Sequence, residues 1–205
     1  MGFEAKPEEI YSSAIASAQY CNEMGLSDVF VVGEPGLIAT LRETGIHVTN
    51  ADGSGEATSH ADQVASAVVA GIHRHFTYEI MQAGMQQVLQ GARLIATNAD
   101  ATYPLEQDRL VPGAGAIIAS LRTCTGVDPY IVGKPNPYIT ELVLKESGVE
   151  ASDALVVGDR YETDIESGIR AGVDTHLVLT GVTKKAPEGQ SVSEDLRALL
   201  SERKS

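Results

Sequence analysis

The feature that most constrains the fold is a regular alternation of short apolar runs with segments of helical spacing. In most of the helical segments, apolar residues recur every three or four positions. The apolar runs lie at residues 29–32, 46–49, 64–70, 92–97, 130–132, 154–157 and 175–179. Strands that alternate with helices of this length predict right-handed βαβ units and a parallel sheet. We therefore expect an α/β protein.

The segments between these runs supply the expected helices. They lie at residues 7–24, 37–43, 77–90, 115–121, 137–146, 163–171 and 191–200, and the stretch 10–14 of the first is also compatible with extended chain. Pro35 suits a first helical turn, and Gly45 and Gly172 suit C-terminal caps. The polar, glycine-rich stretch 50–60 is typical of an exposed loop.

Charge and composition exclude several classes of partner. The 205 residues carry a net charge of −13, which disfavours nucleic acid and anionic membranes because phosphate binding needs clustered Lys and Arg. No apolar stretch approaches the roughly 18–20 residues that a membrane span requires. Cys21 and Cys124 form no metal-type pair or disulfide framework, so we expect a cytoplasmic protein. A phosphate ester remains open as a substrate, since a local metal or lysine can outweigh the global charge.

Three charged residues follow predicted strands in the second half of the chain. Lys134 follows YIVG, Asp159 follows LVVG, and Asp164 lies five residues later. Ligands collect beyond the carboxyl ends of parallel strands, and a tight turn through Gly158 would bring both carboxylates to one opening. Carboxylates suit Mg²⁺, and a lysine can neutralise phosphoryl oxygens, so the pattern favours phosphoryl transfer.

Each of these residues also has a structural interpretation. Asp159 could cap a helix, Asp164 could complement a helix dipole, and Lys134 could be a solvated turn residue. Their ordered appearance at successive strand ends favours the functional interpretation. His73 and His75 stand two apart on an expected strand, where they would face the same side, and we expect a surface pair in preference to a metal site.

The sequence resembles haloacid-dehalogenase-type (HAD) phosphatases of the NagD branch. VGKPNPYI and LVVGDRYETDIESGIRAG resemble the third and fourth motifs of these phosphatases, and LVLTGVT also matches. Upstream, VVGEPGLIATLRETG, HFTYEIM and GARLIATNADATYPLEQDRLVPGAGAI resemble the cap domain of this branch. The resemblance covers nearly the whole chain in the right order. It implies a partial Rossmann-like core with a parallel sheet and an α/β cap.

The resemblance also implies roles for individual residues. Lys134 matches the phosphate-stabilising lysine, which binds substrate and acts in catalysis. Asp159 matches a Mg²⁺ ligand. Asp164 matches a second acidic residue that acts in catalysis and supports either the metal site or the lysine. The substrate-specificity stretch of the cap holds three further candidates for substrate binding, which are Asn98, Asp100 and Tyr103. Some relatives carry histidine where Tyr103 stands, so their substrate preference does not carry over.

The nucleophile signature of this family has no match in these residues. The signature is two aspartates separated by one residue, a nucleophile and a general acid/base, and no two of the aspartates here are two apart. The opening MGFEAKPEEIYSSA resembles the segment that joins core to cap. We therefore expect the catalytic strand to be missing through a truncated gene model, a fragment or a real absence. A half-sheet of this kind should be less stable or should pair with a partner.

The resemblance implies three regions and one activity. Residues 1–24 would connect core and cap, 25–112 would form the cap, and 113–205 would form the C-terminal half of the core. The implied activity is Mg²⁺-dependent hydrolysis of a small phosphorylated metabolite through an aspartyl-phosphate, with this chain inactive alone. A non-catalytic metabolite-binding or assembly module is the alternative, and association into a homo-oligomer through the cap stays open.

Overall fold

The chain folds into two compact units, unit 1 (residues 1–133) and unit 2 (residues 134–205). The structure is a computed structural model that describes residues 5–105 and 109–202. Each unit contains its own parallel sheet, as the alternating sequence pattern predicted. Among the described residues, every helix is too short or too polar to cross a bilayer.

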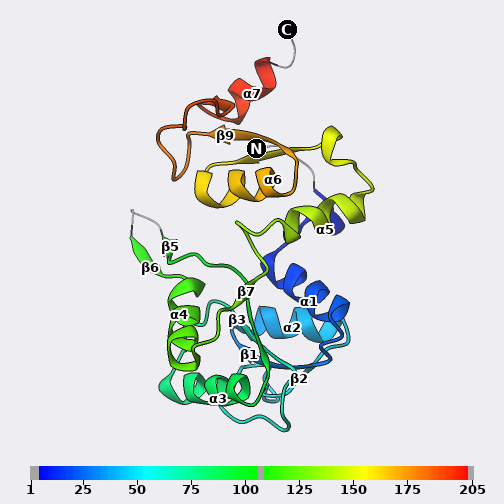
Figure 1. The fold of residues 1–205 in the computed structure, drawn as a ribbon, viewed down its shortest axis with the longest axis vertical. Coiled ribbons are helices and arrows are strands. Elements are labelled where there is room, and N and C mark those ends of the chain that lie inside the picture. The colour runs from blue at the N-terminus through cyan, green and yellow to red at the C-terminus, as the bar shows by residue number, and fades with distance from the viewer. Residues whose placement is uncertain (1–4, 106–108, 203–205) are drawn as a thin grey trace. The chain divides into compact units, whose positions relative to one another are not determined.

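Unit 1 is built on a five-stranded parallel sheet (Figure 1). Its strands are β1 (Asp28–Val32), β2 (His47–Val48), β3 (Ala67–Ala70), β4 (Arg93–Ala96) and β7 (Tyr130–Ile131). Its helices are η1 (Pro7–Glu9), α1 (Ser13–Glu23), α2 (Pro35–Glu43), α3 (Tyr78–Leu89) and α4 (Ala114–Thr125). The strand order is β2-β1-β3-β4-β7, so the direction of winding reverses between β1 and β3.

The helices of unit 1 cover both faces of this sheet (Figure 1). Alternate residues of β1 point to opposite faces, and all four residues from Val29 to Val32 are fully buried. Phe30 and Val32 belong to the core formed with α3 and α4, where Ile80 and Leu121 are buried. Burial on both faces explains why the strands are continuous apolar runs in the sequence.

A buried amide extends the sheet beyond the short strand β2. The side chain of Asn50 accepts a hydrogen bond from the Val31 N–H at 2.8 Å and donates to the Val31 carbonyl at 2.9 Å. It also donates to the Thr58 carbonyl at 2.8 Å. Asn50 is 2% exposed, so its amide replaces water as partner of these backbone groups.

A two-stranded hairpin in unit 1 was not predicted from the sequence. The strands β5 (Thr102–Pro104) and β6 (Leu110–Pro112) follow β4 and precede α4 in the chain, and they pair with each other in antiparallel fashion. Each strand has three residues and ends in proline, so the alternating pattern is too short to detect. The structure also places α4 and β7, which follow the expected boundary at residue 112, in unit 1.

Unit 2 is built on a three-stranded parallel sheet of order β10-β9-β8. Its strands are β8 (Leu155–Gly158), β9 (Asp174–Val178) and β10 (Val192–Ser193). Its helices are α5 (Tyr138–Ser147), η2 (Ala151–Asp153), the π-helical turn η3 (Tyr161–Ile165), α6 (Glu166–Arg170) and α7 (Leu196–Glu202). Within the described part of the chain, β8 pairs on one side only, and Val157 is 38% exposed.

The sequence prediction was wrong at the start of the expected C-terminal helix. Residues 192–193 form β10, and α7 begins only at Leu196. Ser191 and Ser193 stand two apart and both hydrogen-bond His176, which is buried on β9. Two residues of a strand reach the same side at this spacing, so the buried imidazole selects strand over helix.

Two further helix boundaries differ from the prediction. The expected helix from Pro7 breaks at residues 10–12, within the stretch that the sequence left open to extended chain, and α1 begins at Ser13 because the Ser12 hydroxyl caps it by accepting from the Ile15 N–H. The expected helix at 163–171 begins two residues earlier as the π-helical turn η3. This wider turn is closed by Asp164, as described below.

Candidate active site

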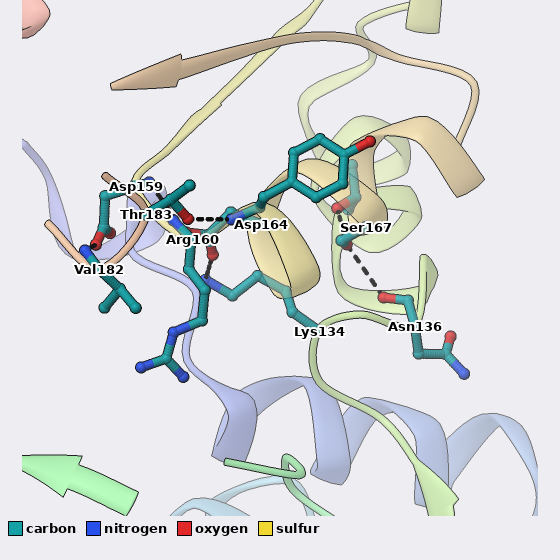
Figure 2. Close-up of polar contacts among 10 residues, drawn as sticks. Lys134, Asn136, Asp159, Arg160, Asp164, Ser167, Val182 and Thr183 are labelled. Carbon is teal, nitrogen blue, oxygen red and sulfur yellow. Dashed lines mark hydrogen bonds and ion pairs between the residues drawn. The ribbon is translucent and has the colours of Figure 1, made fainter. Parts of the chain in front are cut away.

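The three charged residues singled out at strand ends lie together in unit 2 (Figure 2). Lys134 begins unit 2, Asp159 directly follows β8, and Asp164 lies in η3. The Lys134 Nζ donates to Asp164 Oδ1 at 2.6 Å, and the Asp159 N–H donates to Asp164 Oδ2 at 3.2 Å. The turn through Gly158 therefore brings both carboxylates to the carboxyl end of β8, as predicted.

Asp164 is the centre of this group. Its Oδ2 also accepts from the Arg160 N–H at 3.1 Å, so one carboxylate oxygen binds two successive backbone donors of the turn. Its side chain is 12% exposed, whereas that of Lys134 is 51% exposed. The carboxylate thus both closes the start of η3 and holds the ammonium group of Lys134.

Two glycines let the backbone approach these carboxylates closely. A Cβ at position 158 would lie 2.2 Å from the Asp164 Cβ. A Cβ at position 181 would lie 1.7 Å from Asp159 Oδ2. Both distances are far shorter than any van der Waals contact, so only glycine fits at either position without moving an aspartate.

The loop after β9 fixes Asp159. The Asp159 Oδ2 accepts from the Val182 N–H at 2.9 Å, and the Asp159 carbonyl accepts from the Thr183 N–H at 2.9 Å. The Thr183 hydroxyl in turn accepts from the Tyr161 N–H at 2.9 Å. Residues 181–183, part of the LTGVT stretch, therefore connect the turn after β8 to the end of β9.

A buried hydroxyl anchors the loop that carries Lys134. Ser167, which is fully buried in α6, donates to the Asn136 carbonyl at 3.1 Å, and its hydroxyl lies 2.9 Å from that of Thr140 (Figure 2). The start of α5 is thus tied to α6. Sequence reasoning missed Ser167 because an isolated serine in a helix has no distinguishing pattern.

The donor set at this site suits a cation that keeps most of its water. Asp164 uses both carboxylate oxygens on Lys134 and the backbone, whereas Asp159 uses Oδ2. Among the described residues, no three His, Cys, Asp or Glu side chains form a metal-binding group. Mg²⁺ is commonly held by one or two carboxylates together with substrate phosphate and water, so one carboxylate at Asp159 fits it.

The other three candidates lie in unit 1, after β4. Asn98 Oδ1 accepts from the Asp100 N–H at 3.1 Å, and the Asp100 carbonyl accepts from the Gly115 N–H at 2.9 Å. Asn98 lines a cavity of about 280 Å³, and Tyr103, on β5, lines another of about 500 Å³. The structure thus places Asn98 and Tyr103 at different cavities of the same unit.

The expected surface pair of histidines was wrong for His73. His73 is 6% exposed, whereas His75 is exposed, and the segment that holds them is a turn, not a strand. Within the described part of the chain, the buried Nδ1 of His73 has no hydrogen-bond partner. Burial lowers the pKa of His73 below its ordinary value, with a smaller lowering by His75 and an opposing effect of Glu34.

We expect this histidine to make the stability of unit 1 depend on pH. The imidazole of His73 binds a proton more readily in the unfolded chain than in the folded one. The contribution of neutral His73 to the stability of unit 1 is therefore complete above about pH 6.5 and is lost as the pH falls through the lowered pKa. His73→Phe should remove this component, and His75→Phe should keep it. Urea unfolding of both variants and the parent at roughly pH 7.5 and roughly pH 5 measures how much the free energy of unfolding of each changes with pH. Equal pH dependence in parent and His73→Phe would contradict the expectation.

Comparison with known proteins places this chain in a family. The HAD-hydrolase-like family model matches residues 131–199. The 5'-nucleotidase YutF of Bacillus subtilis is 37% identical over 182 residues, which are 88% of this chain and 66% of YutF. NagD of Escherichia coli K-12 superposes with a TM-score of 0.77 at 30% identity, covering 93% of this chain and 72% of NagD. The chain belongs to the HAD phosphatases, in the NagD-type branch.

A third relative carries a metal ion in its structure. Glycerol phosphate phosphatase Rv1692 of Mycobacterium tuberculosis, solved in complex with magnesium, superposes with a TM-score of 0.82 at 31% identity. The match covers 97% of this chain and 60% of Rv1692. The chain likewise spans 66% of the length of the curated HAD relative YutF. Two of these three relatives are named for an activity, one as a 5'-nucleotidase and one as a glycerol phosphate phosphatase.

Proposed function

We propose that this chain supplies the phosphate-binding and metal-binding half of a Mg²⁺-dependent phosphatase of small phosphorylated metabolites. The observation that carries the proposal is the group formed by Lys134, Asp164 and Asp159 at the carboxyl end of β8. We further propose that residues 25–133 act as the cap, with Asn98, Asp100 and Tyr103 in substrate binding, and that residues 134–205 belong to the core, which moves the boundary expected at residue 112 to the one between the two units.

Lys134 is the residue that binds the phosphoryl group in this proposal. An ammonium group has three donors, and one is used on Asp164 while the side chain stays half exposed. The remaining donors can neutralise phosphoryl oxygens during transfer. Of the two supporting roles that the family implies for Asp164, holding the lysine is the one that its contacts favour.

Binding of inorganic phosphate tests this role directly. Lys134→Met should weaken phosphate binding by about tenfold, because a charge-assisted hydrogen bond is lost. Lys145→Met, which removes the same charge from an exposed position on α5, should leave it unchanged. Amide shifts of the full chain during a phosphate titration give both affinities. Equal affinity in the two variants would contradict the proposal.

Asp159 is the residue that we propose as metal ligand. Bound Mg²⁺ would supply positive charge next to the phosphoryl oxygens, while this chain orients the phosphate through Lys134. Asp159→Asn should weaken binding of Mn²⁺, a paramagnetic substitute for Mg²⁺, by about tenfold or more because an anionic ligand is lost. Paramagnetic broadening of amides near residue 159 measures this without activity. The matched control Asp174→Asn, at an exposed position on β9, should bind as the parent does.

The nucleophile is the part of the reaction that these residues do not supply. No two aspartates stand two residues apart in the sequence, and β8 has an edge without a partner among the described residues. We propose that a strand with the nucleophilic aspartate pairs at this edge in the active enzyme, and that the present chain alone does not turn over.

Hydrolysis of 4-nitrophenyl phosphate by the purified chain, with and without Mg²⁺, tests this part. The expected result is no release of nitrophenol above buffer. Mg²⁺-dependent release that Asp159→Asn abolishes would mean that another residue of this chain is the nucleophile. Absence of both turnover and phosphate binding would instead favour the alternative, a binding or assembly module that descends from the phosphatase.

A further inference from the structure

The loop after β9 contacts the turn that carries Asp159 through three hydrogen bonds (Figure 2). The Val182 N–H donates to Asp159 Oδ2, and the Thr183 N–H donates to the Asp159 carbonyl, both at 2.9 Å. The Thr183 hydroxyl accepts from the Tyr161 N–H, also at 2.9 Å. The loop therefore binds the turn on both sides of residue 160.

One of these three bonds depends on the identity of a side chain. Val182 and Thr183 donate through the backbone, and every residue except proline has the same N–H group. The bond from the Tyr161 N–H needs an oxygen on the side chain of residue 183. The hydroxyl of Thr183 is thus the part of this contact that the sequence sets.

The bond from Val182 fixes the orientation of the Asp159 carboxylate. It occupies Oδ2, and within the part of the chain that the structure describes, Oδ1 accepts no hydrogen bond. A carboxylate held at one oxygen presents the other in a defined direction, so Oδ1 is available to a cation. Carboxylates that bind metals are usually held by such outer hydrogen bonds, and loss of one typically weakens metal binding by roughly 10- to 100-fold.

The Thr183 hydroxyl controls this orientation through the backbone. Thr183 directly follows Val182, and Tyr161 lies two residues after Asp159, so the hydroxyl bond joins the loop and the turn next to the carboxylate. Without the hydroxyl, the Tyr161 N–H has no acceptor in a partly buried position. The loop and the turn can then separate, and the Val182 N–H no longer holds Oδ2.

We propose that Thr183 is a positioning residue for the metal ligand Asp159. Its hydroxyl acts through the loop and the carboxylate, and the cation itself is bound by Asp159. This inference rests on the proposed role of Asp159 as metal ligand, and it adds the loop after β9 to the site.

Titration of the full chain with Mn²⁺ tests this role, with paramagnetic broadening of amides near residue 159 as the measure. Thr183→Val keeps the shape of the side chain but loses the hydroxyl, and should weaken Mn²⁺ binding by about tenfold. Thr183→Ser keeps the hydroxyl and should bind Mn²⁺ as the parent does. Thr180→Val is the matched control, because it makes the same change at an exposed position just after β9, and it should also bind as the parent does.

A phosphate titration separates positioning of the metal ligand from general damage to unit 2. Phosphate is proposed to bind through Lys134, so Thr183→Val should keep the phosphate affinity of the parent while its Mn²⁺ affinity falls. If Thr183→Val does not fold, Thr183→Ala also removes the hydroxyl and should show the same selective loss. Equal loss of both affinities, or a loss that Thr183→Ser does not reverse, would overturn the inference.

The Asp159→Asn variant distinguishes failure of this inference from failure of the proposed metal site. If Asp159→Asn weakens Mn²⁺ binding and Thr183→Val does not, the role of Thr183 is wrong and the metal site stands. If neither variant weakens Mn²⁺ binding, the metal site is wrong and the role of Thr183 fails with it.

Discussion

Asp164→Ala is expected to lower the free energy of unfolding of unit 2 by about 2–3 kcal/mol. The alanine leaves the backbone N–H groups of Asp159 and Arg160 without their acceptor. Each unsatisfied donor costs about 1–3 kcal/mol when buried, and these are only partly buried. Loss of the Lys134 ion pair adds little, because that side chain is half exposed and screened by water.

Hydrogen exchange resolved by residue measures this effect within unit 2. Asp164→Asn keeps one oxygen for the two backbone donors but loses the ion pair, so it should cost about 1 kcal/mol. Asp174→Ala, at an exposed position on β9, should cost less than about 0.5 kcal/mol. If Asp164→Ala cost no more than Asp174→Ala, the carboxylate would not organise the turn, and its role in positioning Lys134 would fail with it.

Asn50→Ala is expected to lower the free energy of unfolding of unit 1 by about 3 kcal/mol. The side chain satisfies the Val31 N–H, the Val31 carbonyl and the Thr58 carbonyl, and it is 2% exposed. Alanine leaves the two Val31 groups buried without partners, and the part-buried Thr58 carbonyl loses its donor as well. The change acts on β1, the strand that both helical layers of unit 1 cover.

A matched change elsewhere separates this effect from the loss of any asparagine. Asn22→Ala removes one exposed hydrogen bond, from Nδ2 to the Thr44 carbonyl at 3.3 Å, and should cost less than about 0.5 kcal/mol. Urea unfolding, with exchange of the Val31 amide as a local reporter, compares the two variants. A similar loss of unfolding free energy in both variants would show that the hydrogen bonds of Asn50 contribute no more to stability than a surface contact does.

Sequence periodicity was a good guide wherever strands are buried on both faces. The runs at 29–32 and 92–97 correspond to β1 and β4, because a strand between two helical layers needs apolar residues at every position. Glycine also marked helix ends correctly. Gly45 and Gly172 follow the ends of α2 and α6 with φ values of 85° and 71°, a left-handed conformation that other residues rarely adopt.

Periodicity failed where a few tertiary contacts decide the local structure. The β5–β6 hairpin has strands of three residues, and β10 has two. Ser193 in β10 and Ser191 just before it both hydrogen-bond the buried His176, and nothing near residues 192–193 in the sequence reveals a histidine on another strand.

The sequence by itself determined the α/β class, the places of seven of the ten described strands along the chain and the residues that meet at the end of β8. Strand ends and glycine turns are local features, and local sequence specifies them. Only the tertiary structure decided the state of individual side chains. It paired Asp164 with Lys134, buried Asn50 and left the Nδ1 of His73 without a partner. Hydrogen bonds between distant segments and burial depend on which segments pack together, and no local pattern encodes that.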